Sequence, residues 1–307
     1  MQQAFNPMQE AQIIKQALNK PKNPDAIINI VAHRSNNQRQ QILQSYYNQF
    51  KTQIQDDFRS NLSGNFQEAL VALFFMPLDY DCYQIYNAMK GFGTNEDTLI
   101  EIIGTRSNER LNQIKQRYEQ LFKKNLIQEI EKETSGFFRR VLLALLSAER
   151  QSNTNPNEQE CDECAKRLFS SQKEKKETLQ ETFIEIYTKK SREELALISK
   201  IYYKWYGKTL LEEVERIFSG DSRRILKAII FALLSPSEYF ARRIHKSFKL
   251  FGTNDTVLIR VLVSRDEIDI SRIKRYYKQL FEVTLYDAVK GNISGEYQKL
   301  LLALIGI

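Results

Sequence analysis

Met-Lys-Gly-Phe-Gly-Thr, at residues 89–94, opens the stretch of sequence that decides the fold of this chain. The stretch continues into an apolar helical pattern and closes on Glu-Thr-Ser-Gly at residues 133–136. Two close glycines let a backbone turn sharply with its carbonyl oxygens exposed. Carbonyl oxygens, a carboxylate and water are the ligands that Ca²⁺ prefers. Because Glu133 can supply the carboxylate, the stretch indicates a calcium loop, although a short glycine loop alone is a weak signal.

The frame of this stretch occurs four times along the 307 residues. Each copy has a Ser-Gly pair between two helical patterns, at Ser63-Gly64, Ser135-Gly136, Ser219-Gly220 and Ser294-Gly295. Thirty residues before each glycine stands a basic residue, namely Arg34, Arg106, Lys190 or Arg265. A tyrosine follows twelve residues after the basic residue, and an apolar helical run follows each Ser-Gly pair. Marks that keep their register over the whole length indicate an internal repeat.

Inside each copy the apolar residues follow a helical period. In the third copy, for example, Ile198, Tyr202 and Trp205 fall at positions i, i+4 and i+7 and are predicted to share the core face. The chain has only 11 Gly and 6 Pro, which favours long helices over a turn-rich β fold. We therefore predict an all-α fold of four bundles with about five helices each. The apolar last helix of each copy is expected to lie in the middle of its bundle.

Charge and composition limit the partners. A formal net charge of +7 and a pI near 9.1 favour phosphate-rich membrane surfaces or nucleic acid. The charge is spread through all four copies without a basic stripe or a groove-reading motif, so no nucleic acid is expected. No apolar run reaches the ~18 residues of a membrane span. Residues 1–7 show no secretory signal, so a cytosolic protein is expected.

Cys161 and Cys164 form a C-x-x-C motif among three cysteines. A zinc site needs about two more soft ligands nearby. Neither Cys82 nor either of the two histidines is close in sequence. The pair is interpreted as structural, with redox sensing as the alternative.

The sequence resembles the annexin family in the order of its motifs. Gly-x-Gly-Thr is followed by an apolar helix, Thr-Arg-Ser, a helix with a tyrosine, and an acidic residue before Thr-Ser-Gly, and three variant copies repeat this order. The similarity extends from Gln9 to Ile307. It implies four repeats that form a curved disc, at residues 9–77, 78–150, 164–236 and 237–307, with an N-terminal segment at 1–8 and a linker at 151–163. It also implies a cytosolic protein that binds acidic phospholipids through calcium loops on the convex face of the disc.

The resemblance further implies that the main calcium site of a repeat uses three loop carbonyls and one distant acidic residue. In repeat 2 these positions fall on Met89, Gly91, Gly93 and Glu133. All four keep the required residue type. Repeat 2 is therefore expected to hold the main intact calcium site.

Repeats 1 and 3 depart from this pattern. In repeat 1, Pro21 stands at the second glycine position and Asn61 at the carboxylate position. Proline fixes φ, and an amide carries no charge for a cation. In repeat 3, Ile217 replaces the carboxylate, and three lysines occupy the loop, Lys173, Lys175 and Lys176. These lysines are interpreted either as a solvated charge run or as membrane contacts to anionic lipid.

Repeat 4 is half kept, because Gly252 remains at the second glycine position while Asn292 replaces the acid. A site made of carbonyls alone, including those of Phe248 and Gly252, is expected to bind calcium only weakly. Phe92 and Phe251 lie at the apices of their loops. They are interpreted either as membrane contacts that enter the headgroup boundary or as packing against a neighbouring loop.

The expected function is calcium-dependent binding to acidic phospholipid membranes, as a peripheral protein in the cytoplasm. With one intact site, the gain in membrane affinity that comes from binding through several loops at once is largely lost. A calcium requirement on the order of 10⁻⁴ M or weaker is therefore expected. No catalytic constellation is found, so no enzymatic activity is expected. The alternative is a structural scaffold that self-associates or binds a cytoskeletal partner, with weak or calcium-independent membrane binding. The altered loops favour this alternative, whereas the retention of Glu133 favours calcium-dependent binding.

Overall fold

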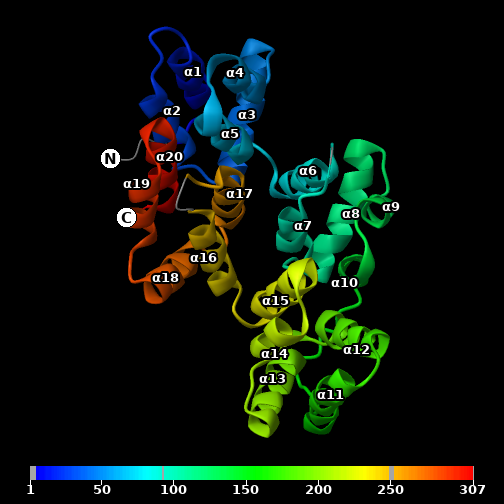
Figure 1. Cartoon of the computed structure of the whole chain (residues 1–307). Coiled ribbons are helices and arrows are strands. Elements are labelled where there is room, and N and C mark those ends of the chain that lie inside the picture. Colours follow the sequence, from blue (N-terminus) through cyan, green and yellow to red (C-terminus); the bar gives the residue numbers. More distant parts are fainter. Residues whose placement is uncertain (1–4, 92, 249–251, 307) are drawn as a thin grey trace. The chain divides into compact units, whose positions relative to one another are not determined.

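The computed structural model describes residues 5–91, 93–248 and 252–306. Within these ranges the chain is helical throughout, apart from loops, one 3₁₀ turn at Ser171–Lys173 and one isolated bridge (Figure 1). The α-helices are α1 (Pro7–Ala17), α2 (Pro24–Val31), α3 (Asn36–Phe50), α4 (Ile54–Asn61), α5 (Gly64–Leu73), α6 (Pro77–Met89), α7 (Glu96–Ile103), α8 (Asn108–Phe122), α9 (Leu126–Glu133), α10 (Gly136–Leu146), α11 (Glu158–Ser170), α12 (Lys176–Lys189), α13 (Arg192–Tyr206), α14 (Leu210–Ile217), α15 (Gly220–Leu234), α16 (Pro236–Ser247), α17 (Asp255–Arg265), α18 (Ile270–Phe281), α19 (Leu285–Asn292) and α20 (Gly295–Ile305).

Five helices make up each repeat, and the predicted all-α fold is confirmed. The repeat boundaries drawn from the sequence stay predictions. Several of them fall inside helices, and the largest difference is at the linker predicted at 151–163, within which α11 begins. The side chain of Asn157 caps α11 by accepting hydrogen bonds from the backbone N–H groups of Gln159 and Glu160, at 2.9 and 3.2 Å. This cap fixes the start of the helix earlier than the apolar pattern indicates.

The chain forms two compact units, each built around the last helices of its repeats. In the first unit, drawn from residues 1–80 and 240–307, α5 packs on α17, and α20 packs on α2 and α5. In the second unit, residues 81–239, α10 packs on α12 and α15, and α15 packs on α7. The last helices therefore have neighbours on several sides, as their nearly all-round apolar pattern predicts.

One side-chain contact joins the first and third helices of every repeat. The third helix ends in an aromatic ring, and a side chain of the first helix lies flat on it or places a cation over it. The pairs are Lys15 with Phe50, Tyr86 with Phe122, Phe169 with Tyr206 and His245 with Phe281. The three ring pairs are stacked with centroids 4.2, 3.9 and 3.7 Å apart in that order. Such contacts fix the angle between the two helices beyond what burial alone provides.

This contact corrects one prediction. Trp205 does not face the core as its period indicates, because its side chain is 57% exposed. Its indole N–H donates to Asp162 at 2.8 Å on the surface of α11. The adjacent Tyr206 packs instead, since the ring of Phe169 offers it a stacking partner.

The basic residue that marks each repeat binds a carboxylate. In repeats 1 and 2 the acid lies on the first helix, with 2.7 Å between Arg34 and Glu10 and 2.8 Å between Arg106 and Asp81. Arg110 shares Asp81 at 2.9 Å. Burial opposes the charged form of Arg106, but the Asp81 carboxylate outweighs it and raises the pKa of Arg106 above its usual range.

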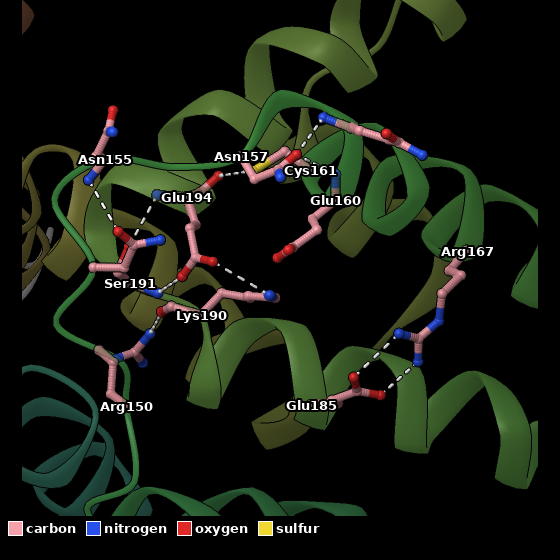
Figure 2. Close-up of polar contacts among 12 residues, drawn as sticks. Arg150, Asn155, Asn157, Glu160, Cys161, Arg167, Glu185, Lys190, Ser191 and Glu194 are labelled. Carbon is pink, nitrogen blue, oxygen red and sulfur yellow. Dashed lines mark hydrogen bonds and ion pairs between the residues drawn. The ribbon is translucent and has the colours of Figure 1, made fainter.

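Repeat 3 places the acid elsewhere, as Figure 2 shows. Glu194, on the third helix, accepts from Lys190 at 3.3 Å and from the backbone N–H of Ser191 at 2.8 Å. The first helix carries Cys164 where repeats 1 and 2 carry their acid. Arg150 donates to the carbonyl of Lys190 at 2.7 Å, and its burial lowers the pKa of Arg150 to about 10.

In repeat 4 the acid stands four residues after the basic residue, as it does in repeat 3. Arg265 donates to Asp269 at 2.7 Å, four residues later in the chain. Its guanidinium carbon lies 4.4 Å from the centroid of Phe240, which occupies the first-helix position of the missing acid. The basic residue thus has the same place in all four repeats, whereas its carboxylate partner comes from the first helix in repeats 1 and 2 and from four residues further along the chain in repeats 3 and 4.

The three cysteines are buried and free. The Sγ atom of Cys161 donates to the carbonyl of Glu194 at 3.9 Å, and burial raises the pKa of the Cys161 thiol to about 11. A thiol with a raised pKa carries little reactive thiolate, which favours the structural interpretation of the Cys161 and Cys164 pair. Among the described residues, no helix is both long and apolar enough to cross a membrane.

Candidate calcium site

The loop between α6 and α7 in repeat 2 is closed by its own backbone. The N–H of Asn95 donates to the carbonyl of Ala88 at 2.7 Å, and the side chain of Asn95 caps α7. Between them Gly91 and Gly93 have φ of +107° and +90°. Side chains with a Cβ rarely adopt these angles, so both positions require glycine even though there is space around them. The loop therefore turns back on itself where the sequence predicts the carbonyl ligands.

Glu133 is held beside this loop. It is the last residue of α9, and its side chain is 22% exposed. The hydroxyl of Thr94 donates to the backbone carbonyl of Glu133 at 2.9 Å, which ties the loop to the end of α9 across 39 residues of sequence. The Glu133 carboxylate has the exposed Lys132 amino group 3.5 Å away. A divalent cation can displace the Lys132 amino group at small cost, because ion pairs of an exposed lysine contribute little.

The donor set suits a hard cation. As predicted from the sequence, it would consist of main-chain oxygens at the end of α6 and in the loop, with the carboxylate of Glu133. In the part of the chain that the structure describes, no three His, Cys, Asp and Glu side chains gather to hold a metal. A site here must therefore take most of its ligands from carbonyls and water, which Ca²⁺ accepts and a transition metal does not favour.

Repeat 1 has a different loop. The backbone N–H of Asn23 donates to the carbonyl of Ala17 at 2.9 Å, so the closed loop is one residue shorter than in repeat 2. The Lys22 ammonium donates to the backbone carbonyl of Asn61, where repeat 2 uses the neutral hydroxyl of Thr94. A positive charge at this place opposes the binding of a second cation.

Repeat 4 keeps the loop of repeat 2 more closely. Asn254 donates to the carbonyl of Ser247 at 2.7 Å, which gives the full loop length, and Gly252 has φ of +86°. Phe248 pairs with Thr253 in an isolated antiparallel bridge. Phe251 and its counterpart Phe92 in repeat 2 lie outside the described residues, so their predicted membrane contacts stay predictions.

The acid position of repeat 4 differs in its contacts. The Asn292 amide donates to the carbonyl of Ala288 at 2.8 Å, within its own helix. The hydroxyl of Thr253 donates to Asp255 at 2.7 Å instead of to the end of α19.

Repeat 3 has no comparable loop. A 3₁₀ turn ends at Lys173, and α12 begins at Lys176, so the segment between them is short and has no glycine. Lys173, Lys175 and Lys176 are all exposed. The Lys173 amino group lies 5.9 Å from the ring centroid of Phe169.

Thr94 and the capping asparagines were not predicted as site residues. The signal for the caps is present in the sequence, because Asn23, Asn95 and Asn254 each stand directly before a helix start. The hydrogen bond between Thr94 and Glu133 cannot be predicted from the sequence, because it joins segments 39 residues apart.

The fold and these loops define a protein of four homologous helical repeats. A family model described as Annexin matches residues 9–73, 80–145, 164–229 and 239–304, so the chain belongs to the annexin family. This family is known for calcium-dependent phospholipid binding and is generally non-enzymatic.

Three similar proteins illustrate the relationship. Human annexin A7 is 35% identical over 303 residues, which cover 98% of this chain and 62% of that protein. The chain thus spans less than two thirds of the length of annexin A7. The structure of annexin III matches this chain with a TM-score of 0.94 at 33% sequence identity. The match covers 99% of this chain and 95% of the annexin III chain. Calcium-bound annexin (Sm)1 has a TM-score of 0.84 at 32% identity, with 99% and 91% covered.

Proposed function

We propose that this annexin binds acidic phospholipid membranes in a calcium-dependent manner, with repeat 2 as its main calcium site. The observation that carries the proposal is the closed double-glycine loop tied by Thr94 to the end of α9, where Glu133 provides a carboxylate. The carbonyls of Met89, Gly91 and Gly93 and the Glu133 carboxylate are the proposed ligands. The calcium that annexin (Sm)1 holds in its structure supports the same cation here.

The other repeats contribute less in this proposal. Repeat 4, through the carbonyls of Phe248 and Gly252, binds calcium weakly because it lacks the acid. Repeat 3 contributes the exposed lysines of its short segment, each worth about 1 kcal/mol near an anionic surface. We place the protein in the cytoplasm, on the inner surface of membranes, which its buried free cysteines support.

The test is co-sedimentation with phosphatidylserine vesicles across a calcium titration. Wild type is compared with Glu133→Gln and with the matched control Glu131→Gln, an exposed glutamate on the same helix. We expect calcium-dependent binding with a midpoint on the order of 10⁻⁴ M, lost in Glu133→Gln and kept in the control.

Other outcomes contradict the proposal in different ways. Equal binding of all three proteins without calcium assigns membrane contact to the lysines. Saturation at low micromolar calcium contradicts the single weak site. No binding at any calcium concentration favours a self-associating or cytoskeletal scaffold, for which the altered loops of repeats 1, 3 and 4 are the supporting observation.

A further inference from the structure

A groove of about 690 Å³ lies between α18 and the start of α19. Both helices, labelled in Figure 1, belong to the first unit. The volume of the groove is in the range of small-molecule sites, roughly 300–1,000 Å³. Three basic side chains of α18 line the groove, namely Lys274, Arg275 and Lys278, together with Gln279 of the same helix. Tyr286 and Asp287 line it from the start of α19. None of these residues belongs to the calcium loops.

The three basic residues have different roles. Lys274 donates to the carbonyls of Ile305 and Gly306, at 2.9 and 3.1 Å, and so holds the end of α20. Arg275 and Lys278 are exposed, and no partner for either side chain occurs among the residues that the structure describes. The one carboxylate of the groove, on Asp287, already accepts from the hydroxyl of Thr284 at 2.5 Å.

The same corner of repeat 2 shows what the fold itself requires. Lys115 donates to the carbonyl of Leu146 at 2.6 Å, as Lys274 does at the end of α20, so this lysine belongs to the framework. The next positions, however, hold Gln116 and Glu119, which line a cavity of about 520 Å³ in repeat 2. Arg275 and Lys278 are therefore not needed to build the corner, and their charges are available for a ligand.

We propose that this groove binds the phosphate groups of a soluble phosphorylated small molecule. The Arg275 guanidinium offers a planar fork that matches phosphate, and Lys278 adds a point charge one turn away. The backbone N–H groups of Leu285 and Tyr286, at the start of α19, have no acceptor in the described chain, since those of the next two residues use Thr284. Two free cations favour an anionic ligand over a neutral one, and phosphate accepts hydrogen bonds from cationic side chains and from the N–H groups at a helix start.

The position of the groove favours a soluble ligand over a lipid headgroup. Asn292, at the calcium-loop end of α19, lies at the opposite end of this eight-residue helix, which is about 12 Å long. A ligand in the groove therefore lies one helix length from the loop that faces the membrane. This step alone rests on the proposed membrane orientation; the phosphate chemistry does not.

The test uses inositol trisphosphate as the soluble probe, measured by titration calorimetry with the full chain in a calcium chelator. Three variants accompany wild type. Arg275→Glu/Lys278→Glu removes the free cations. Lys200→Glu/Lys290→Glu changes the net charge equally at exposed lysines elsewhere. Gln116→Arg/Glu119→Lys, added to the first variant, transfers the basic pair to repeat 2.

We expect binding by wild type and the control, a loss of roughly tenfold or more per removed cation in the first variant, and partial recovery in the third. No binding by wild type, or equal loss in the charge-matched control, overturns the proposal. In a second arm, binding to phosphatidylcholine vesicles that contain phosphatidylinositol bisphosphate, without binding to the soluble probe, assigns the groove to a lipid and overturns the soluble source. Because calcium is absent, failure here is separate from failure of the repeat 2 site.

Discussion

Removal of one buried carboxylate tests how much the ion pair between the first helix and the basic residue stabilises a repeat. Asp81→Asn keeps the shape of the side chain but removes the carboxylate that two arginines bind, Arg106 at 2.8 Å and Arg110 at 2.9 Å. The side chains of Asp81 and Arg106 are 4% and 11% exposed. Water therefore cannot replace the lost charge. Breaking a buried pair from one side costs about 3–5 kcal/mol, and the free energy of unfolding should fall by that amount.

The assay is urea unfolding followed by the fluorescence of Trp205, the only tryptophan. Trp205 and Asp81 both lie in the second unit, so the signal reports the unit that the substitution affects. Glu149→Gln is the control, because Glu149 and its partner Lys189 are both exposed and lie in the same unit as Trp205. That pair should contribute less than about 1 kcal/mol.

A second substitution makes the prediction sharper. Repeats 3 and 4 place their acid four residues after the basic residue, so Arg110→Glu reproduces that arrangement beside Arg106. Added to Asp81→Asn, it should recover at least about 1 kcal/mol by pairing the buried arginine again. A loss below about 1 kcal/mol in Asp81→Asn, or a further loss in the double variant, would refute the reasoning.

Three further predictions concern single positions. Asn292→Glu should lower the calcium midpoint of vesicle binding by about tenfold or more through a second site, while Asn61→Glu should not; equal midpoints for wild type and Asn292→Glu would contradict this. Burial lowers the pKa of His245 below its usual 6.5, so the unfolded chain binds the proton more readily and stability falls as pH drops through that range. His245→Tyr should remove this loss, measured as the change in Tm between pH 7.5 and 5.5, and an unchanged loss would exclude His245 as its source. Burial opposes the charge of Glu194, but hydrogen bonds from Ser191 and Lys190 outweigh it and hold its pKa below 4.5. Its contribution is present above pH 4.5 and is lost as pH falls through its folded value, so Glu194→Gln should lower Tm at pH 7 and flatten the acid dependence; a parallel Tm curve would argue against it.

The fold was predictable because its marks are local. The Ser-Gly pairs stand at the starts of α5, α10, α15 and α20, and the basic residues keep a fixed distance from them. What could not be predicted depends on contacts between segments. Trp205 and Tyr206 both fit the helical period, and only the ring of Phe169 decides which of them packs. The carboxylate partners of Lys190 and Arg265 likewise do not come from the first helix, which the positions of the basic residues do not show.

The calcium loops show the same limit most clearly. In sequence, repeats 1 and 4 share one defect, an asparagine at the acid position, at Asn61 and Asn292. In the structure they differ in kind, because the loop of repeat 4 closes over the full length and that of repeat 1 is one residue short. Repeat 1 also places the Lys22 ammonium on the Asn61 carbonyl. A carboxylate added there would pair with an ammonium already in place, whereas in repeat 4 it would be free to bind calcium.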